Sequence, residues 1–197
     1  AIGFEVIEKA YPVTHIVIPP SLASQGVTSA DLAQSLAQSD NVTLEDILAV
    51  ATAQYHFTGP FVEPTDTWKD VGGFGTVRQD RNGSIRHLGV DLDGDIGDSV
   101  RATNSGVVVY ADELENFGNS VVIDHGLGVF SIYLHLSFIQ TEVNSTVSAG
   151  ERIGSIGNSG AYTLAPHLHF SIKVRGTSVN PRSFIDTLNA MLIPSAV

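Results

Sequence analysis

From residue 59 to about residue 179, short runs of β-branched and aromatic residues alternate with Gly, Asn, Asp and Ser. This alternation is typical of antiparallel strands joined by tight turns. Residues 97–111 predict one hairpin, and residues 120–124 and 129–134 predict a second. Residues 143–160 continue the pattern without forming a strict repeat. The middle of the chain therefore predicts a mostly β domain.

The first 58 residues follow a different pattern. Residues 4–7 and 14–18 predict short strands, and two short helices should follow. Ser29 is the expected N-cap of the first helix, which runs to residue 38, and Thr43 that of the second. The expected apolar stripe of the second helix consists of Leu44, Ile47, Leu48 and Ala51. We expect residues 1–58 to form a small α/β appendage.

The C-terminal end predicts a helix over residues 181–192. Asn180 is a good N-cap and Pro181 suits the first helical position. One face of this helix is apolar and consists of Phe184, Ile185, Leu188 and Leu192. We therefore divide the chain into the appendage and a domain over residues 59–197 that includes this helix.

Composition and charge exclude several classes of function. The formal net charge is −11 with ten scattered Lys and Arg residues, whereas nucleic acids are bound through clustered cations. The chain has no cysteine, so histidine and carboxylate are the strong metal ligands that remain. No apolar run approaches the roughly 20 residues of a membrane span. Ala1 opens the chain without an initiator Met or a signal-peptide pattern, and we expect a processed or excised soluble piece.

Two histidine motifs supply candidate chemistry. In a strand, residues i and i+2 share a face, so His167 and His169 would project together into one cleft. With His87 and Asp91, they offer the three nitrogen and oxygen ligands of a catalytic zinc and leave one histidine over. Gly89 suggests a close backbone turn that brings His87 and Asp91 inward. One histidine of the pair can bind metal while its neighbour handles protons.

The ordered motifs resemble the LytM/lysostaphin-type zinc metallopeptidase domain, the M23 peptidase family of bacterial peptidoglycan hydrolases. The motifs that carry the resemblance span about 120 residues: Gly73-Phe74-Gly75 with Arg78, His87-Leu88-Gly89-Val90-Asp91, Gly97 to Ala102 with Gly106, Gly118 to Gly126, Tyr133-Leu134-His135-Leu136-Ser137, Gly150 to Gly154, Pro166-His167-Leu168-His169-Phe170, and Val179-Asn180-Pro181. Any one fragment is weak, whereas the ordered set is specific.

The resemblance implies a mainly β (α+β overall) fold, an antiparallel β-sheet or hybrid-barrel domain with a groove. It implies one Zn2+ per chain held by His87, Asp91 and His169, with His135 and His167 as catalytic histidines. Three protein ligands leave an open position for water, as hydrolysis requires. The implied activity is that of an endopeptidase acting on peptidoglycan peptide, and the substrate class implies an extracytoplasmic location. The bond, whether in a glycine bridge or a D-amino-acid cross-link, is not identified.

Other polar residues have weaker cases. His125 belongs to neither ligand motif, and a structural or second-shell role is expected for it. Arg78 and Arg86 are candidates for contacting a substrate carboxylate or for forming local ion pairs. Tyr133 is a further candidate for the second shell or the substrate. His15 and His56 lie in the appendage and are interpreted as incidental.

Several alternatives stay open. Residues 91–95 resemble the start of a calcium loop, but Ile96 and Ala102 stand where the loop needs Gly and Glu. Some domains that resemble the family lack ligands and activate other wall hydrolases, so a non-catalytic or latent module is the main alternative function. Residues 1–58 are a candidate blocker of the open zinc position. A phosphocarrier-like or biotinyl-like domain ranks last. The acidic chain also suggests that a targeting domain or partner protein brings the enzyme to the wall.

Overall fold

The computed structural model of the protein describes residues 9–50, 52–81, 83–161 and 163–192. The strand predicted at residues 4–7 and the stripe residue Ala51 lie outside these ranges. In chain order the elements are β1 (Val13–His15), α1 (Pro20–Ala23), α2 (Ser29–Gln38), α3 (Asp40–Leu48), β2 (Asp70–Gly72), β3 (Val77–Asp80), β4 (Gly83–Arg86), β5 (Val90–Asp93), β6 (Ser99–Arg101), β7 (Gly106–Leu114), β8 (Gly118–Gly126), β9 (Val129–Leu136), β10 (Phe138–Ile139), β11 (Thr146–Val147), β12 (Arg152–Ser155), β13 (His167–Val174), β14 (Thr177–Val179) and α4 (Pro181–Leu192).

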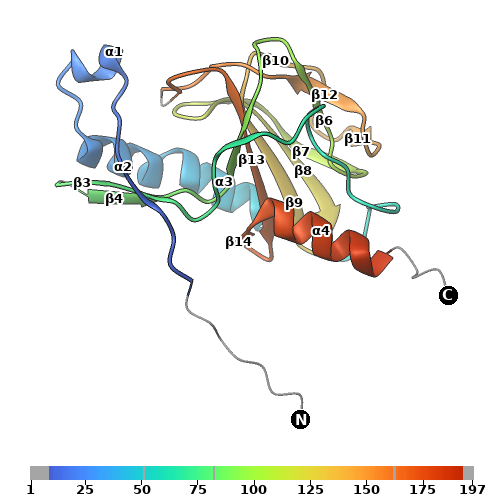
Figure 1. The fold of residues 1–197 in the computed structure, drawn as a ribbon. Coiled ribbons are helices and arrows are strands. Elements are labelled where there is room, and N and C mark those ends of the chain that lie inside the picture. Colours follow the sequence, from blue (N-terminus) through green and yellow to red (C-terminus); the bar gives the residue numbers. More distant parts are fainter. Residues whose placement is uncertain (1–8, 51, 82, 162, 193–197) are drawn as a thin grey trace.

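Most strands belong to one large antiparallel sheet with the order β11-β7-β8-β9-β13-β5-β2, and β14 also pairs with β13. A smaller antiparallel sheet has the order β10-β12-β6 (Figure 1). A third sheet joins β1 in parallel to the β3–β4 hairpin. The predicted mainly β, antiparallel fold is confirmed. Within the described ranges, no helix has the length and apolar character needed to cross a bilayer.

One predicted hairpin is confirmed and the other is wrong. β8 and β9 pair as predicted for residues 120–134. β6 and β7 do not pair with each other, because β6 pairs with β12 in the small sheet and β7 with β8 and β11 in the large one. Residues 102–105 instead carry the chain between the sheets, and the Thr103 amide donates to the Tyr133 hydroxyl at 2.8 Å. The turn signal is real, but the flanking strands find other partners.

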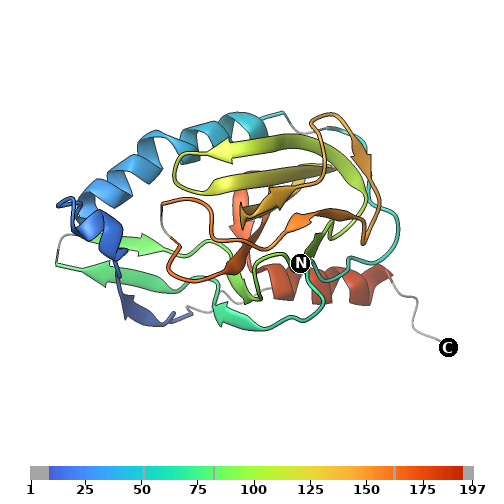
Figure 2. The same ribbon diagram turned by 90° about the horizontal axis from the view of Figure 1, so that it is seen from above.

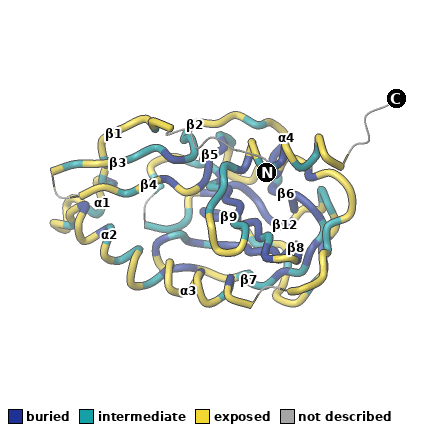
Figure 3. The backbone as a smooth tube through the Cα atoms, turned by 90° about the horizontal axis from the view of Figure 1, so that it is seen from below, coloured by how far each residue is buried: buried dark blue, intermediate teal, exposed yellow. Residues whose placement is uncertain are grey.

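Two apolar clusters hold the large sheet from opposite faces. One cluster contains Val100 of β6, Ile153 of β12, Tyr133 of β9 and Ile185 of α4. The other joins α3 to residues of β7, β8 and β9, namely Leu44, Leu48, Leu114, Val122, Phe130, Ile132 and Leu134. Figure 2 shows α2 and α3 along one side of the sheet and α4 on the other. In Figure 3, β8 and β9 are largely buried, whereas much of α2 is exposed.

Helix starts depend partly on contacts that local sequence cannot show. The cap of α2 is Thr28 and not Ser29, since Thr28 and Asp31 form a reciprocal capping box. α3 begins at Asp40 and not after Thr43, because Asp40 is drawn inward by a contact with the loop after β7. The prediction for α4 is confirmed, since Asn180 Oδ1 accepts from the Ser183 amide at 3.0 Å.

The N-terminal segment, residues 9–58, lies against the sheet along much of its length. β1 extends the β3–β4 hairpin, α3 shares a core with β7 to β9, and the His56 amide donates to the His125 carbonyl at 2.7 Å. A bridge also joins Tyr55 to Gly126 at the end of β8. The division of the chain at residue 58 stays a prediction.

Candidate metal centre and groove

A glycine lets the first two predicted ligands approach the strand that carries the third. His87 lies just after β4 and Asp91 in β5, with Gly89 between them. A Cβ on Gly89 would lie 2.7 Å from the Phe170 carbonyl oxygen and 2.6 Å from His169 Nε2, and closer still to Ser171 Oγ. The close backbone approach predicted from Gly89 is therefore present, and only glycine fits there.

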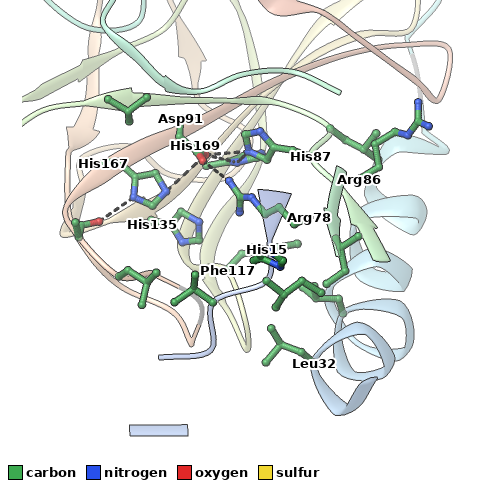
Figure 4. Close-up of a pocket in the computed structure, with 18 of the residues that line it drawn as sticks. His15, Leu32, Arg78, Arg86, His87, Asp91, Phe117, His135, His167 and His169 are labelled. Carbon is green, nitrogen blue, oxygen red and sulfur yellow. Dashed lines mark hydrogen bonds and ion pairs between the residues drawn. The ribbon is translucent and has the colours of Figure 1, made fainter. Parts of the chain in front are cut away.

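β13 places the two histidines of the His-x-His motif at one site. In its antiparallel pairing with β5, His169 lies opposite Asp91 and His167 opposite Asp93. His169 Nδ1 is 2.9 Å from Asp91 Oδ1, and His167 Nε2 is 3.6 Å from the same oxygen. The two side chains share a face, as the strand period predicts, and both point toward Asp91 in Figure 4.

Three donor atoms form a nearly equilateral triangle. His87 Nε2 is 3.0 Å from Asp91 Oδ1 and 3.1 Å from His169 Nδ1, and the third side is the 2.9 Å between His169 and Asp91. In the parts of the chain that the structure describes, these residues form the one cluster of His, Cys, Asp and Glu side chains with metal-binding spacing. Tetrahedral zinc with bonds of about 2.0–2.1 Å separates its ligands by roughly 3.3 Å. The triangle fits such an ion with a shift of a few tenths of an ångström.

The His87 and His169 rings each form a hydrogen bond through the nitrogen that points away from the triangle, and this bond determines whether the other nitrogen carries a lone pair or a proton. His87 Nδ1 is 3.0 Å from the Gly73 carbonyl, and a carbonyl accepts only, so the Nδ1 proton is donated there. His169 Nε2 is 2.9 Å from Ser171 Oγ, whose own proton is donated to the Leu88 carbonyl. In the neutral rings, His87 Nε2 and His169 Nδ1 then present lone pairs toward Asp91. Three mutually facing acceptors need a cation among them, which is the chemistry of a metal site.

Asp91 is held as a carboxylate. Burial acts to raise its pKa, but hydrogen bonds with His169 and His87 hold the pKa of this carboxyl well below its ordinary value. Burial also lowers the pKa of His169, which favours the neutral ring. Arg78 donates from Nη2 to Asp91 Oδ2 at 2.7 Å. Oδ1 thus faces the triangle while Oδ2 is occupied by the guanidinium.

A β-bulge directs His135 into the same site. Between the pairs Asn119–Leu136 and Val121–Tyr133, β9 has one residue more than β8. His135 has a φ of 67°, and the alternation of β9 is broken so that Leu136 enters the core beside Tyr133. The His135 ring lies 4.9 Å from the His167 ring, centroid to centroid.

Both rings of this second pair are oriented by carbonyl oxygens. His135 Nδ1 donates to Ser159 O at 3.1 Å, and His167 Nδ1 donates to Ala165 O at 2.8 Å. In its neutral form, each ring therefore keeps a lone pair on Nε2. Burial, followed by the nearby His169 and His167, lowers the pKa of His135 to about 3. His135 is thus a neutral base at physiological pH.

The site opens into a cavity of about 600 Å³. One side carries the four histidines and Asp91, and the N-terminal segment supplies another part of the lining (Figure 4). These N-terminal residues are His15, Ile16, Val17, Leu32, Leu36 and Asn41. Sequence reasoning missed them, and it interpreted His15 as incidental. No local motif marks them, since only the packing of α2 and β1 beside the groove brings them there.

The weaker candidates are divided by the fold. Arg78 and Arg86 both line the cavity, but the Arg86 guanidinium lies 5.4 Å from the centre of the Tyr11 ring. His125 and Tyr133 are fully buried in the core and do not line the cavity, and Ser131 Oγ bridges them at 2.8 and 3.0 Å. The calcium alternative at residues 91–95 finds no support among the described residues, where Asp93 pairs with Lys69.

Comparison with known proteins agrees with this geometry. Residues 85–181 match peptidase family M23. Peptidoglycan DD-endopeptidase ShyA of Vibrio cholerae is 45% identical over 94 residues, which covers 48% of this chain and 22% of ShyA. Murein hydrolase activator NlpD of Escherichia coli is 36% identical over 98 residues, which covers 49% of this chain and 25% of NlpD. The chain thus spans about a quarter or less of the length of these relatives.

A solved structure adds evidence at the level of the fold. The crystal structure of a zinc containing peptidase from Vibrio cholerae superposes with a TM-score of 0.55 at 27% identity, covering 64% of this chain and 39% of that one. The family match over residues 85–181 includes strands β5 to β14 and the His-Asp-His cluster that fits zinc. Residues 85–181 therefore belong to a peptidase domain of family M23, of the kind found in peptidoglycan hydrolases and in activators of such hydrolases.

Proposed function

We propose that this domain is a zinc-dependent endopeptidase that hydrolyses peptide cross-links of bacterial peptidoglycan. One observation carries the proposal: three lone-pair donors 2.9–3.1 Å apart lie beside two further imidazoles, His135 and His167, in a cavity of about 600 Å³. A structural zinc site normally closes with a fourth protein ligand, whereas three ligands leave a position open for catalysis.

His87, Asp91 and His169 would hold one zinc ion per chain. Bound there, zinc supplies a Lewis acid that polarises a carbonyl and lowers the pKa of water to about 7. The Gly73 carbonyl and Ser171 hydroxyl fix the two rings, and Arg78 keeps Asp91 Oδ2 occupied. The half-exposed Arg78 guanidinium retains further N–H donors, which suit a carboxylate of the substrate.

His135 and His167 would move protons. Each donates its Nδ1 proton to a backbone carbonyl, so Nε2 is free to take the proton of the attacking water. The resulting imidazolium can stabilise the developing oxyanion and then protonate the leaving amine. The low pKa of His135 keeps this ring unprotonated between pH 6 and 8. The two rings share these tasks.

The relatives suggest the bond. ShyA, a DD-endopeptidase by name, is 45% identical over the matched region. We therefore favour a D-amino-acid-containing cross-link over a glycine bridge. A substrate of this class places the protein outside the cytoplasm, in the periplasm or cell wall. The net charge of −11 argues against capture by anionic wall polymers, so we infer that a targeting domain or a partner protein brings the enzyme to the wall.

The second candidate is a module that activates another wall hydrolase. The 36% identity with NlpD favours it. The presence of all five polar side chains, namely His87, Asp91, His135, His167 and His169, around one cavity favours the enzyme.

Zinc content and peptidoglycan cleavage by the wild type, His167→Ala and His169→Ala test the choice. The enzyme predicts near one zinc in the wild type and His167→Ala, little in His169→Ala, and cutting by the wild type alone. Mass spectrometry of the fragments distinguishes D-amino-acid cross-links from glycine bridges. Stoichiometric zinc without cutting, combined with stimulation of a separate wall hydrolase, would favour the activator.

A further inference from the structure

The loop between β7 and β8, residues 115–117, lies between the N-terminal helices and His135. On its outer side it contacts α2 and α3, and on its inner side it contacts the end of β9. None of these residues belongs to the ligand or histidine motifs. The loop nevertheless forms the link between the N-terminal segment and a predicted catalytic side chain.

Asp40, the first residue of α3, anchors the loop from the outside. Its side chain is buried, with 1% of the residue exposed. Asp40 Oδ2 accepts from the Asn116 and Phe117 amides, both at 2.8 Å. Ser35 Oγ of α2 adds a hydrogen bond to Asn116 Oδ1 at 3.0 Å. A buried carboxylate that receives two amide protons fixes both residues at once.

The loop in turn holds His135 on two sides. The Phe117 carbonyl accepts from the His135 amide at 3.1 Å, and the two rings meet edge to face with centroids 6.4 Å apart. The Asn116 carbonyl accepts from the Ala161 amide at 3.0 Å, which holds the segment whose Ser159 carbonyl orients the His135 ring.

His135 needs such support because of its backbone. A φ of 67° is unfavourable for a residue with a Cβ, and it persists only where the surroundings fix it. The hydrogen bond to Phe117 and the bond from the ring to Ser159 are the contacts that do so. Asp40 holds the Phe117 amide and so stabilises the first hydrogen bond directly. It stabilises the hydrogen bond to Ser159 indirectly, through Asn116.

We propose that Asp40 is a positioning residue for His135 and that the N-terminal segment is therefore a working part of the catalytic site. This rests on the proposed function, in which His135 handles protons. Weakening the link at Asp40 should lower turnover. A segment that only blocks the groove predicts the opposite, since loosening it should raise turnover.

The test compares Asp40→Ala, Asp40→Asn and Leu44→Ala in the full chain. Asparagine keeps an oxygen that can accept both amides, so it should restore the link. Leu44 is buried in the same helix and belongs to the apolar cluster on the sheet, against which Phe117 also packs, but its side chain cannot hydrogen-bond to the loop amides. Its replacement therefore controls for lost packing and stability. We expect kcat of Asp40→Ala to fall about 10- to 100-fold with KM changed less than about threefold. Asp40→Asn should stay within about threefold of the wild type, and all variants should bind zinc.

Hydrogen exchange of the His135 amide supplies a readout besides activity. Asp40→Ala should lose hydrogen-exchange protection at this amide. In Leu44→Ala, protection of the amide should fall only as far as the decrease in the global free energy of unfolding accounts for. Equal loss of kcat in Leu44→Ala and Asp40→Ala, or an unchanged His135 amide in Asp40→Ala, would overturn the proposal. A wild type that binds zinc without cutting would refute the proposed function, and the exchange experiment would still decide the role of Asp40.

Discussion

Replacing Gly89 by alanine tests whether close packing of two strands builds the metal centre. The added Cβ would lie 2.7 Å from the Phe170 carbonyl and 2.6 Å from His169 Nε2, with Ser171 Oγ also in contact. Ordinary contacts of this kind lie near 3.4 Å, so the neighbours must move by about 0.7 Å or more. One of these neighbours is backbone in the middle of a paired strand, which cannot rotate away. Overpacking of this kind costs about 1–3 kcal/mol.

The expected result has two parts. At about 2–4 °C per kcal/mol for a chain of this length, the Tm of Gly89→Ala should fall by about 2–12 °C in the presence of a chelator. Displacement of His169 from Ser171 should weaken zinc binding about 10- to 100-fold, as the loss of an orienting partner does. Calorimetric melting and competition with a zinc chelator measure the two effects separately.

Gly83→Ala is the matched control. A Cβ on Gly83 would meet nothing within 4 Å, so this variant should keep both its Tm and its zinc affinity. A Gly89→Ala protein with the Tm and zinc affinity of the wild type would refute the reasoning, because a methyl group would then fit where the structure leaves no space.

Three further predictions follow from charges and donors. Burial lowers the pKa of His125 to about 4, below its ordinary 6.5. As the pH falls, the unfolded chain therefore protonates this histidine before the folded chain does. About 3 kcal/mol of the free energy of unfolding present above pH 6.5 should be lost as the pH falls to about 4. Urea unfolding between pH 7 and 4 checks this, and a pH slope in His125→Gln as steep as in the wild type would contradict it. Arg78→Ala should weaken zinc binding about 10-fold or more by freeing Asp91 Oδ2. The guanidinium of Arg86 lies over the Tyr11 ring, so Arg86→Ala should keep the zinc affinity of the wild type. Equal zinc affinities of the two variants in chelator competition would argue against a role for Arg78. His167→Ala should retain zinc and His169→Ala should lose it, and equal depletion in elemental analysis would exclude these roles.

Local sequence patterns were sufficient to predict features that depend on the side-chain period of a strand or helix, or on a single helix-capping residue. The β8–β9 hairpin followed from alternation and turn residues, and α4 from Asn180 and Pro181. The side-by-side arrangement of His167 and His169 followed from the two-residue period of a strand. The absence of cysteine limited the strong ligands to histidine and carboxylate. These inferences need no knowledge of what the strands pack against.

Other features depend on contacts between distant parts of the chain. The strands on either side of residues 102–105 pair in different sheets. Asp40, the first residue of α3, accepts a hydrogen bond from the Asn116 amide, which lies 76 residues further along the chain. The position of His135 depends on a β-bulge that cannot be predicted from the residue types around it. Hydrophobic periodicity shows which face of an element is buried but not which partner covers it.

The sequence alone thus determined the strand-rich fold, the chemistry of the candidate metal ligands and the grouping of His87, Asp91 and His169 in one motif set. Only the tertiary structure placed their donor atoms within 3.1 Å of one another, oriented the lone pairs through Gly73 and Ser171, and set the N-terminal segment along the groove. The physical reason is that residue type limits the chemistry a side chain can perform, whereas its direction and neighbours arise from packing between strands far apart in the chain.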